Sequence, residues 1–185
     1  IRYLFLTGYE NLASTDPRVK KVMEEVRSSP LVASLLGTLT ENGEIPFHAY
    51  SKWRGAFWTL LQLVDIGYPP CDSMLVPMME QSHAWLLDPS FLKRVPQING
   101  RWRRCALQEA GAVLADVQLG FITSKTEELV EQLLKWQWPD GGWNCDKKPL
   151  ASHSSFYETW IPLRALNAYA RVRREERVQM AVEKA

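Results

Sequence analysis

The stretch LLKWQWPDGGW, at residues 133–143, joins the end of a helix, a tight turn and a returning tryptophan. Residues 124–127 (Ser-Lys-Thr-Glu) have the pattern of a capping box, which predicts that an amphipathic helix begins there and continues into this stretch. Residues 140–142 (Asp-Gly-Gly) are typical of a turn that requires positive φ. We expect Trp143 to pack back into the protein at the start of the next connection.

The helical pattern extends over most of the chain. Asp16 and Pro17 are a capping residue and a preferred first-turn residue, so they predict N-terminal helices over residues 16–37. Further on, segments that are apolar on most sides alternate with segments that have one apolar face. These segments cover residues 51–66, 74–87, 104–119, 124–136, 156–170 and 175–182. The sequence therefore predicts an all-α protein.

A short pattern recurs along the chain. Residues 79–81 with Trp85 (Met-Glu-Gln and Trp) return as residues 130–132 with Trp136 (Val-Glu-Gln and Trp), which is a period of about 50 residues. A helix pair in each period predicts an α/α toroid, built from stacked hairpins with the apolar helices inside. We expect a single domain over residues 1–185. Its repeats would cover residues 47–95, 96–150 and 151–185, after the N-terminal helices at 16–37. An open helical scaffold without catalytic activity is the alternative.

The composition is that of a folded globular protein. Of 185 residues, 46% are hydrophobic and 23% are charged, and the formal net charge is +1. These values exclude a disordered chain and provide no basic field for nucleic acid, so we expect no nucleic-acid partner. No apolar run reaches the ~20 residues that a transmembrane helix needs. Three cysteines do not suit a disulfide framework, so we expect reduced thiols and a cytoplasmic location, with peripheral attachment to a membrane as an alternative.

The candidate metal ligands lie where an outer helix of one hairpin connects to the inner helix of the next. Because the hairpins alternate in direction, these connections are expected at one end of the array. They contain or adjoin Cys105, Cys145 and His153, and thiolates and imidazoles that converge in this way suit Zn²⁺. In the alternative interpretation, Cys105 is an ordinary buried thiol and His153 a helix cap.

The same end of the array is rich in basic side chains. Arg54, Arg101, Arg103 and Arg104 lie close to the N-termini of inner helices, where backbone N–H groups also favour anions. This arrangement predicts a site for a phosphate or diphosphate group. The alternative is that these cations only pair with neighbouring carboxylates on a solvated face.

Aromatic residues of the inner helices are candidates for binding an apolar molecule below this basic end. We expect Trp53, Phe57, Phe156 and Trp160 to line a cavity for a hydrocarbon tail, although rings of this kind often only fill a core. The candidate proton carriers are the carboxylates of Glu109, Asp146 and Glu158. The alternative is that Glu109 and Glu158 are held by arginine partners, for which Arg54, Arg104 and Arg164 are candidates.

Residues 133–143 resemble the Gln-Trp repeat of squalene–hopene cyclases and related terpene cyclases, which also occurs in protein prenyltransferase β subunits. Residues 99–171 as a whole are similar to bacterial proteins described as prenyltransferase/squalene-cyclase-like. The resemblance implies an α/α toroid, with Trp143 among the substrate-binding residues. It also implies a zinc site near inner-helix starts, with His153 close to the position of a cysteine ligand in the prenyltransferases. Cys105, Cys145 and His153 are loosely similar to the ligands of lanthionine cyclases. The Asp-x-Asp-Asp acid motif of class II terpene cyclases does not occur in this chain.

The resulting functional prediction is an isoprenoid-handling enzyme of the terpene cyclase/prenyltransferase type, or a fragment of one, that acts on a hydrophobic molecule such as an isoprenoid diphosphate. The alternatives are a non-catalytic helical-repeat binding protein and a zinc-dependent toroid enzyme acting on peptide thiols. A complete toroid has more hairpins than three, and the chain starts with Ile1. We therefore expect either self-association or a further part of the chain.

Overall fold

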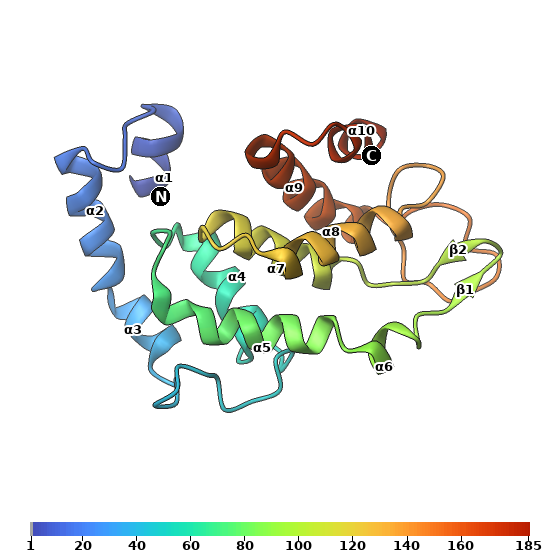
Figure 1. Ribbon diagram of the computed structural model, residues 1–185, viewed down its shortest axis with the longest axis horizontal. Helices are drawn as coiled ribbons and strands as arrows, with labels where there is room; N and C mark the ends of the chain where they lie inside the picture. The colour runs from blue at the N-terminus through green and yellow to red at the C-terminus, as the bar shows by residue number, and fades with distance from the viewer. Residues whose placement is uncertain (1) are drawn as a thin grey trace. The chain divides into compact units, whose positions relative to one another are not determined.

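The computed structural model describes residues 2–185, and its helices confirm the all-α prediction (Figure 1). The chain divides into two compact units, Ile1–Gln81 and Ser82–Ala185, which are described separately. Helix α5 (Val76–Leu86) runs across the boundary between them. No helix in the described part of the chain is both long and apolar enough to cross a membrane.

The first unit is built from short helices. Asp16 accepts a hydrogen bond from the N–H of Arg18 and Pro17 occupies the first turn of α2, which confirms the predicted helix start. Before α5, the unit contains α1 (Arg2–Leu4), the π-helical turn η1 (Phe5–Tyr9), α2 (Pro17–Arg27), α3 (Pro30–Leu36), α4 (Ala56–Ile66) and the 3₁₀ turn η2 (Ser73–Leu75).

Helix α4 forms the core of the first unit. Phe57, Leu60 and Leu63 are each no more than 2% exposed. The helix begins at Ala56, later than the apolar pattern from residue 51 indicated, because the preceding residues form turns and Trp53 adopts φ 66°. It ends where Gly67 adopts the left-handed conformation that glycine favours.

The second unit packs one buried helix against two others. Helix α7 (Leu107–Gln118) packs against α8 (Ser124–Trp136) and α9 (Phe156–Arg173), and α10 (Glu176–Lys184) packs against α9 (Figure 1). Residues 108–116 of α7 are all buried, as expected for a helix that is apolar on most sides. The unit also contains α6 (Pro89–Leu92) and the two-residue strands β1 (Gln97–Ile98) and β2 (Arg101–Trp102).

The Gln-Trp stretch folds as its sequence predicted. Gly141 adopts φ 95°, and the indole of Trp143 is 1% exposed and donates to the Leu133 carbonyl at 3.0 Å. A Cβ on Gly142 would lie 2.5 Å from the Cβ of Ser154, so this position also requires glycine. The Gln137 amide donates to the Gly141 carbonyl at 2.7 Å, which closes the turn.

Two local features differ from the predicted ones. The capping box of α8 is formed by Thr123 and Thr126, one residue before the predicted residues 124–127. The hydroxyl of Thr126 also donates to the buried carboxylate of Asp116 at 2.7 Å, and this tertiary bond favours the earlier register. The connection at residues 96–104 contains a β-hairpin whose turn, Asn99-Gly100, has positive φ at both residues.

Candidate functional site

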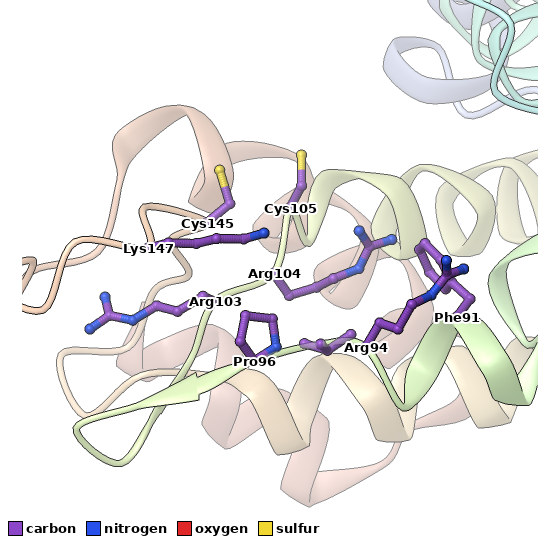
Figure 2. Close-up of a pocket in the computed structure, with 9 residues that line it drawn as sticks. Phe91, Arg94, Pro96, Arg103, Arg104, Cys105, Cys145 and Lys147 are labelled. Carbon is purple, nitrogen blue, oxygen red and sulfur yellow. The ribbon is translucent and has the colours of Figure 1, made fainter.

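The second unit contains a pocket of about 370 Å³ beside the first turns of α7 and α9. Figure 2 shows Cys105 and Cys145 side by side, with their sulfur atoms turned the same way. Lys147 passes below Cys145 and extends towards Arg104 in this view. The pocket is lined by Phe91, Arg94, Val95, Pro96, Arg103, Arg104, Cys105, Cys145 and Lys147.

Two thiols and one carboxylate converge at the edge of this pocket. Cys105 Sγ donates to Glu158 Oε1 at 3.3 Å, and Cys145 Sγ donates to the same oxygen at 3.4 Å. One ligand atom from each of the three residues lies within 4.8 Å of the other two. Cys105 precedes α7, Cys145 follows the Gln-Trp turn, and Glu158 lies in the first turn of α9. The tertiary structure therefore brings together residues that are up to 53 positions apart.

Burial and the nearby carboxylate of Glu158 both raise the pKa values of the two thiols. Burial raises the pKa of Cys105 strongly, and the charge of Glu158 raises it further. Burial and the Glu158 charge also raise the pKa of Cys145, whose residue is nevertheless exposed at the surface. Without a cation, both thiols therefore stay protonated at neutral pH.

The donor atoms suit a zinc ion. Two sulfur atoms and a carboxylate oxygen match the preferences of Zn²⁺ and leave a coordination position open for another ligand. Among the described side chains, Glu158 Oε2 is buried and has no hydrogen-bond partner, so it is available as a ligand. Cys105, Cys145 and Glu158 are thus the residues that would hold the ion.

A buried ion pair supports the wall of the pocket. Arg104 donates to Glu109 Oε1 from Nε at 2.9 Å and from Nη2 at 2.6 Å, and Nη2 also donates to Gln108 Oε1 at 2.5 Å. Glu109 is fully buried in the first turn of α7, and burial raises its pKa to about 7 although Arg104 opposes the shift. The Arg104 guanidinium also lies 4.5 Å from the centre of the Phe91 ring.

We predict that stability depends on pH through Glu109. Its pKa is raised from 4.5 to about 7, so between these pH values the folded state holds a proton that the unfolded state has lost. The stabilisation is complete below pH 4.5 and is lost as the pH rises through 7. Relative to the Glu109→Gln variant, the wild type should lose on the order of 3 kcal/mol of unfolding free energy over this range. Urea unfolding of both proteins at several pH values measures the difference, and parallel pH profiles would contradict it.

The cationic side chains of the pocket differ in whether they already have hydrogen-bond or ion-pair partners. Arg103 donates to the carbonyls of Ala151 at 3.0 Å and Ile98 at 3.3 Å, and lies 4.5 Å from the Trp138 ring centre, so it fastens the loops together. Arg104 is occupied by Glu109, as described above. Lys147 is exposed and has no hydrogen-bond or ion-pair partner among residues 2–185. Lys147 is therefore the cation best placed to meet an added anion.

The other candidates near the thiols have structural contacts. Asp146 Oδ1 accepts from the Lys148 N–H at 2.9 Å, which shapes the loop. His153 is exposed, its carbonyl accepts from the Asn144 amide at 2.8 Å, and its side chain does not belong to the group of potential metal ligands. The third member of that group is Glu158, which was expected to be a proton carrier.

The remaining predicted substrate-binding residues do not line the pocket. Trp143 is in the core, whereas Phe156 and Trp160, on α9, are 80% and 52% exposed. Arg101 lies 5.6 Å from the Trp138 ring centre. In the first unit, Trp53 is exposed, Arg54 lies over the Phe47 ring at 4.1 Å, and Phe57 is buried.

A buried polar network in the second unit was not predicted. His83 Nε2 lies 2.8 Å from Asp116 Oδ2, which also accepts from the Thr126 hydroxyl, and all three side chains are buried. His83 and Asp116 are 33 residues apart on different helices, so no local pattern links them. The Asn-Gly dipeptide at residues 99–100, in contrast, was a usable signal for the β-hairpin.

Comparison of the chain with protein-family models, with curated proteins and with solved structures gave no match.

Proposed function

We propose that this chain is an isoprenoid-handling enzyme of the terpene cyclase/prenyltransferase type, or a part of one, with a zinc ion held by Cys105, Cys145 and Glu158. The convergence of these three side chains at the edge of a basic pocket is the observation that carries the proposal. The resemblance of residues 133–143 to the Gln-Trp repeat adds the isoprenoid class of substrate. The toroid and its repeats belong to the same proposal.

The pocket provides separate surfaces for a charged and an apolar group. Lys147 and Arg94 line it and are exposed, so they are suited to bind the diphosphate head. Phe91, Val95 and Pro96 form an apolar wall against which a hydrocarbon chain can lie. A volume of about 370 Å³ accommodates the head and the first part of such a chain.

The other polar residues hold this arrangement in place. Glu109 fixes the orientation of Arg104 through two hydrogen bonds and so maintains the positive wall of the pocket. Glu158 orients both thiols by accepting a hydrogen bond from each. A bound zinc ion supplies a Lewis acid and favours the thiolate forms of its ligands. The part played by Asp146 as a proton carrier remains a prediction.

Metal content and ligand binding test the proposal together. We expect elemental analysis of the purified protein to find zinc in equimolar amount, and to find none in the Cys105→Ser/Cys145→Ser variant. We expect farnesyl diphosphate to bind in calorimetry, about tenfold more weakly to Lys147→Ala and more weakly at high salt. Lys148→Ala is the matched control, since Lys148 is exposed and adjacent but does not line the pocket. A metal-free wild type, or no saturable binding of the diphosphate, would overturn the proposal.

A helical-repeat binding protein is the second candidate function. It is favoured by the first turns of α9, where Phe156, Tyr157 and Trp160 are 80%, 83% and 52% exposed. Exposed aromatic side chains of this kind are enriched where proteins bind one another. Peptide binding that is lost in Phe156→Ala and Trp160→Ala, in a metal-free protein, would favour this function over the enzyme.

A further inference from the structure

We propose that Cys105 and Cys145 are a site of reversible oxidation, at which an intrachain disulfide forms by exchange with a low-molecular-mass disulfide. The two sulfur atoms lie within 4.8 Å of each other and share one hydrogen-bond acceptor, Glu158 Oε1. This inference goes beyond the proposed function, because it requires neither a metal ion nor an isoprenoid substrate.

The structure lets one of the two cysteines meet an external reagent. Cys145 is exposed, whereas Cys105 is only partly accessible. Cys145 also lies in a connection without helix or strand, between the Gln-Trp turn and α9, so its backbone is not held by helical hydrogen bonds. The sulfurs would have to approach from within 4.8 Å to the ~2.05 Å of an S–S bond, and the connection that carries Cys145 is the segment that would move.

The chemistry balances in two exchange steps. The sulfur of Cys145 attacks the reagent RSSR, the S–S bond of the reagent breaks, a mixed disulfide forms on Cys145, and one RSH leaves with the Cys145 proton. The sulfur of Cys105 then attacks the Cys145 sulfur, so that the Cys105–Cys145 bond forms and a second RSH leaves with the Cys105 proton. The two protein thiols are oxidised by two electrons, and the reagent is reduced to two thiols.

The contacts of the two thiols with Glu158 affect the rate of disulfide formation more than the extent of oxidation at equilibrium. Each thiol donates a hydrogen bond to Glu158 Oε1, and each sulfur must give up this contact before it attacks, which slows the reaction. The proximity of the second thiol favours the intrachain disulfide over the mixed one at equilibrium, because its attack is intramolecular. The extent of oxidation at equilibrium is therefore the quantity to measure.

The sequence makes the pairing simple to identify. Trypsin places the three cysteines on separate peptides, namely residues 55–93 with Cys71, 105–125 with Cys105 and 136–147 with Cys145. Cys71 is exposed and belongs to the other unit, so it is an internal control for non-selective oxidation.

The test is incubation of the full chain with oxidised glutathione, followed by alkylation, non-reducing digestion and mass spectrometry. A chelator in every sample makes the result independent of zinc binding. We expect the peptides 105–125 and 136–147 to be linked, their alkylation to be lost, and dithiothreitol to restore it, while Cys71 carries only glutathione or remains alkylated. In Cys105→Ser, Cys145 should instead retain glutathione. A mixed disulfide on Cys145 of the wild type without the linked peptides, or a linkage through Cys71, would overturn the inference.

Discussion

Replacing Trp143 by alanine is expected to lower the free energy of unfolding by about 3–5 kcal/mol, as for other large-to-small changes of buried aromatic side chains. Trp143 is 1% exposed, and its indole N–H donates to the Leu133 carbonyl at 3.0 Å, inside the core of the second unit. The substitution therefore leaves a cavity and removes the partner of a buried carbonyl. Urea unfolding monitored by circular dichroism measures the loss.

Two further variants show which part of Trp143 matters. Trp143→Phe fills most of the space and loses only the hydrogen bond and some volume, so it should cost about 1–2 kcal/mol. Trp160→Ala is the control for the loss of a tryptophan as such, because Trp160 is 52% exposed and in the same unit. Equal effects of Trp143→Ala and Trp160→Ala would show that Trp143 does not support the core.

Replacing Arg104 by methionine is expected to cost about 3–5 kcal/mol at pH 8, where the buried Glu109 carboxylate is ionised and would lose its partner. Glu109 is 0% exposed, and the side chain of Arg104 provides both hydrogen bonds to its Oε1. The cost should be smaller at pH 5 than at pH 8, because protonation of Glu109 removes the unpaired charge. Arg104 opposes the rise in the pKa of Glu109, so without Arg104 this pKa should rise further. Urea unfolding at the two pH values provides the comparison.

The double variant Arg104→Met/Glu109→Leu separates a buried charge from lost packing. Both charges are removed together, so the stability should return to within about 1–2 kcal/mol of the wild type. If the double variant is as unstable as Arg104→Met alone, the cost comes from the packing of Arg104 against Phe91 and Gln108, and not from the unpaired carboxylate.

The sequence predicted correctly those features that depend on interactions between neighbouring residues, and less accurately those that depend on distant ones. The start of α2 at Asp16-Pro17 and the positive φ of Gly141 depend on neighbouring residues, and both were predicted. The capping box of α8 was placed one residue too late, because the Thr126 hydroxyl also bonds to Asp116, ten residues earlier. The period of about 50 residues and the toroid stay predictions.

The candidate site shows the same dependence. Cys105 and Cys145 were expected to meet, and they do, but their companion is Glu158 and not His153. His153 is exposed in the connection before α9, whereas Glu158 is turned inwards on the first turn of that helix. Packing decides which side chains at the start of a helix face a neighbouring element. The residue types in the sequence show which side chains can bind a metal, but not which of them face one another.

The sequence by itself determined the all-α class, the approximate positions of most helices and the Gln-Trp turn, because helical periodicity, caps and glycine φ angles act over a few residues. Only the tertiary structure decided that two thiols and a carboxylate share one corner beside a basic pocket. It also decided that Arg104 is used by Glu109 and that Phe156 and Trp160 stay exposed. These outcomes depend on how α7 packs against α9 and on which polar groups are removed from water by that packing. Both are decided only when the whole unit folds.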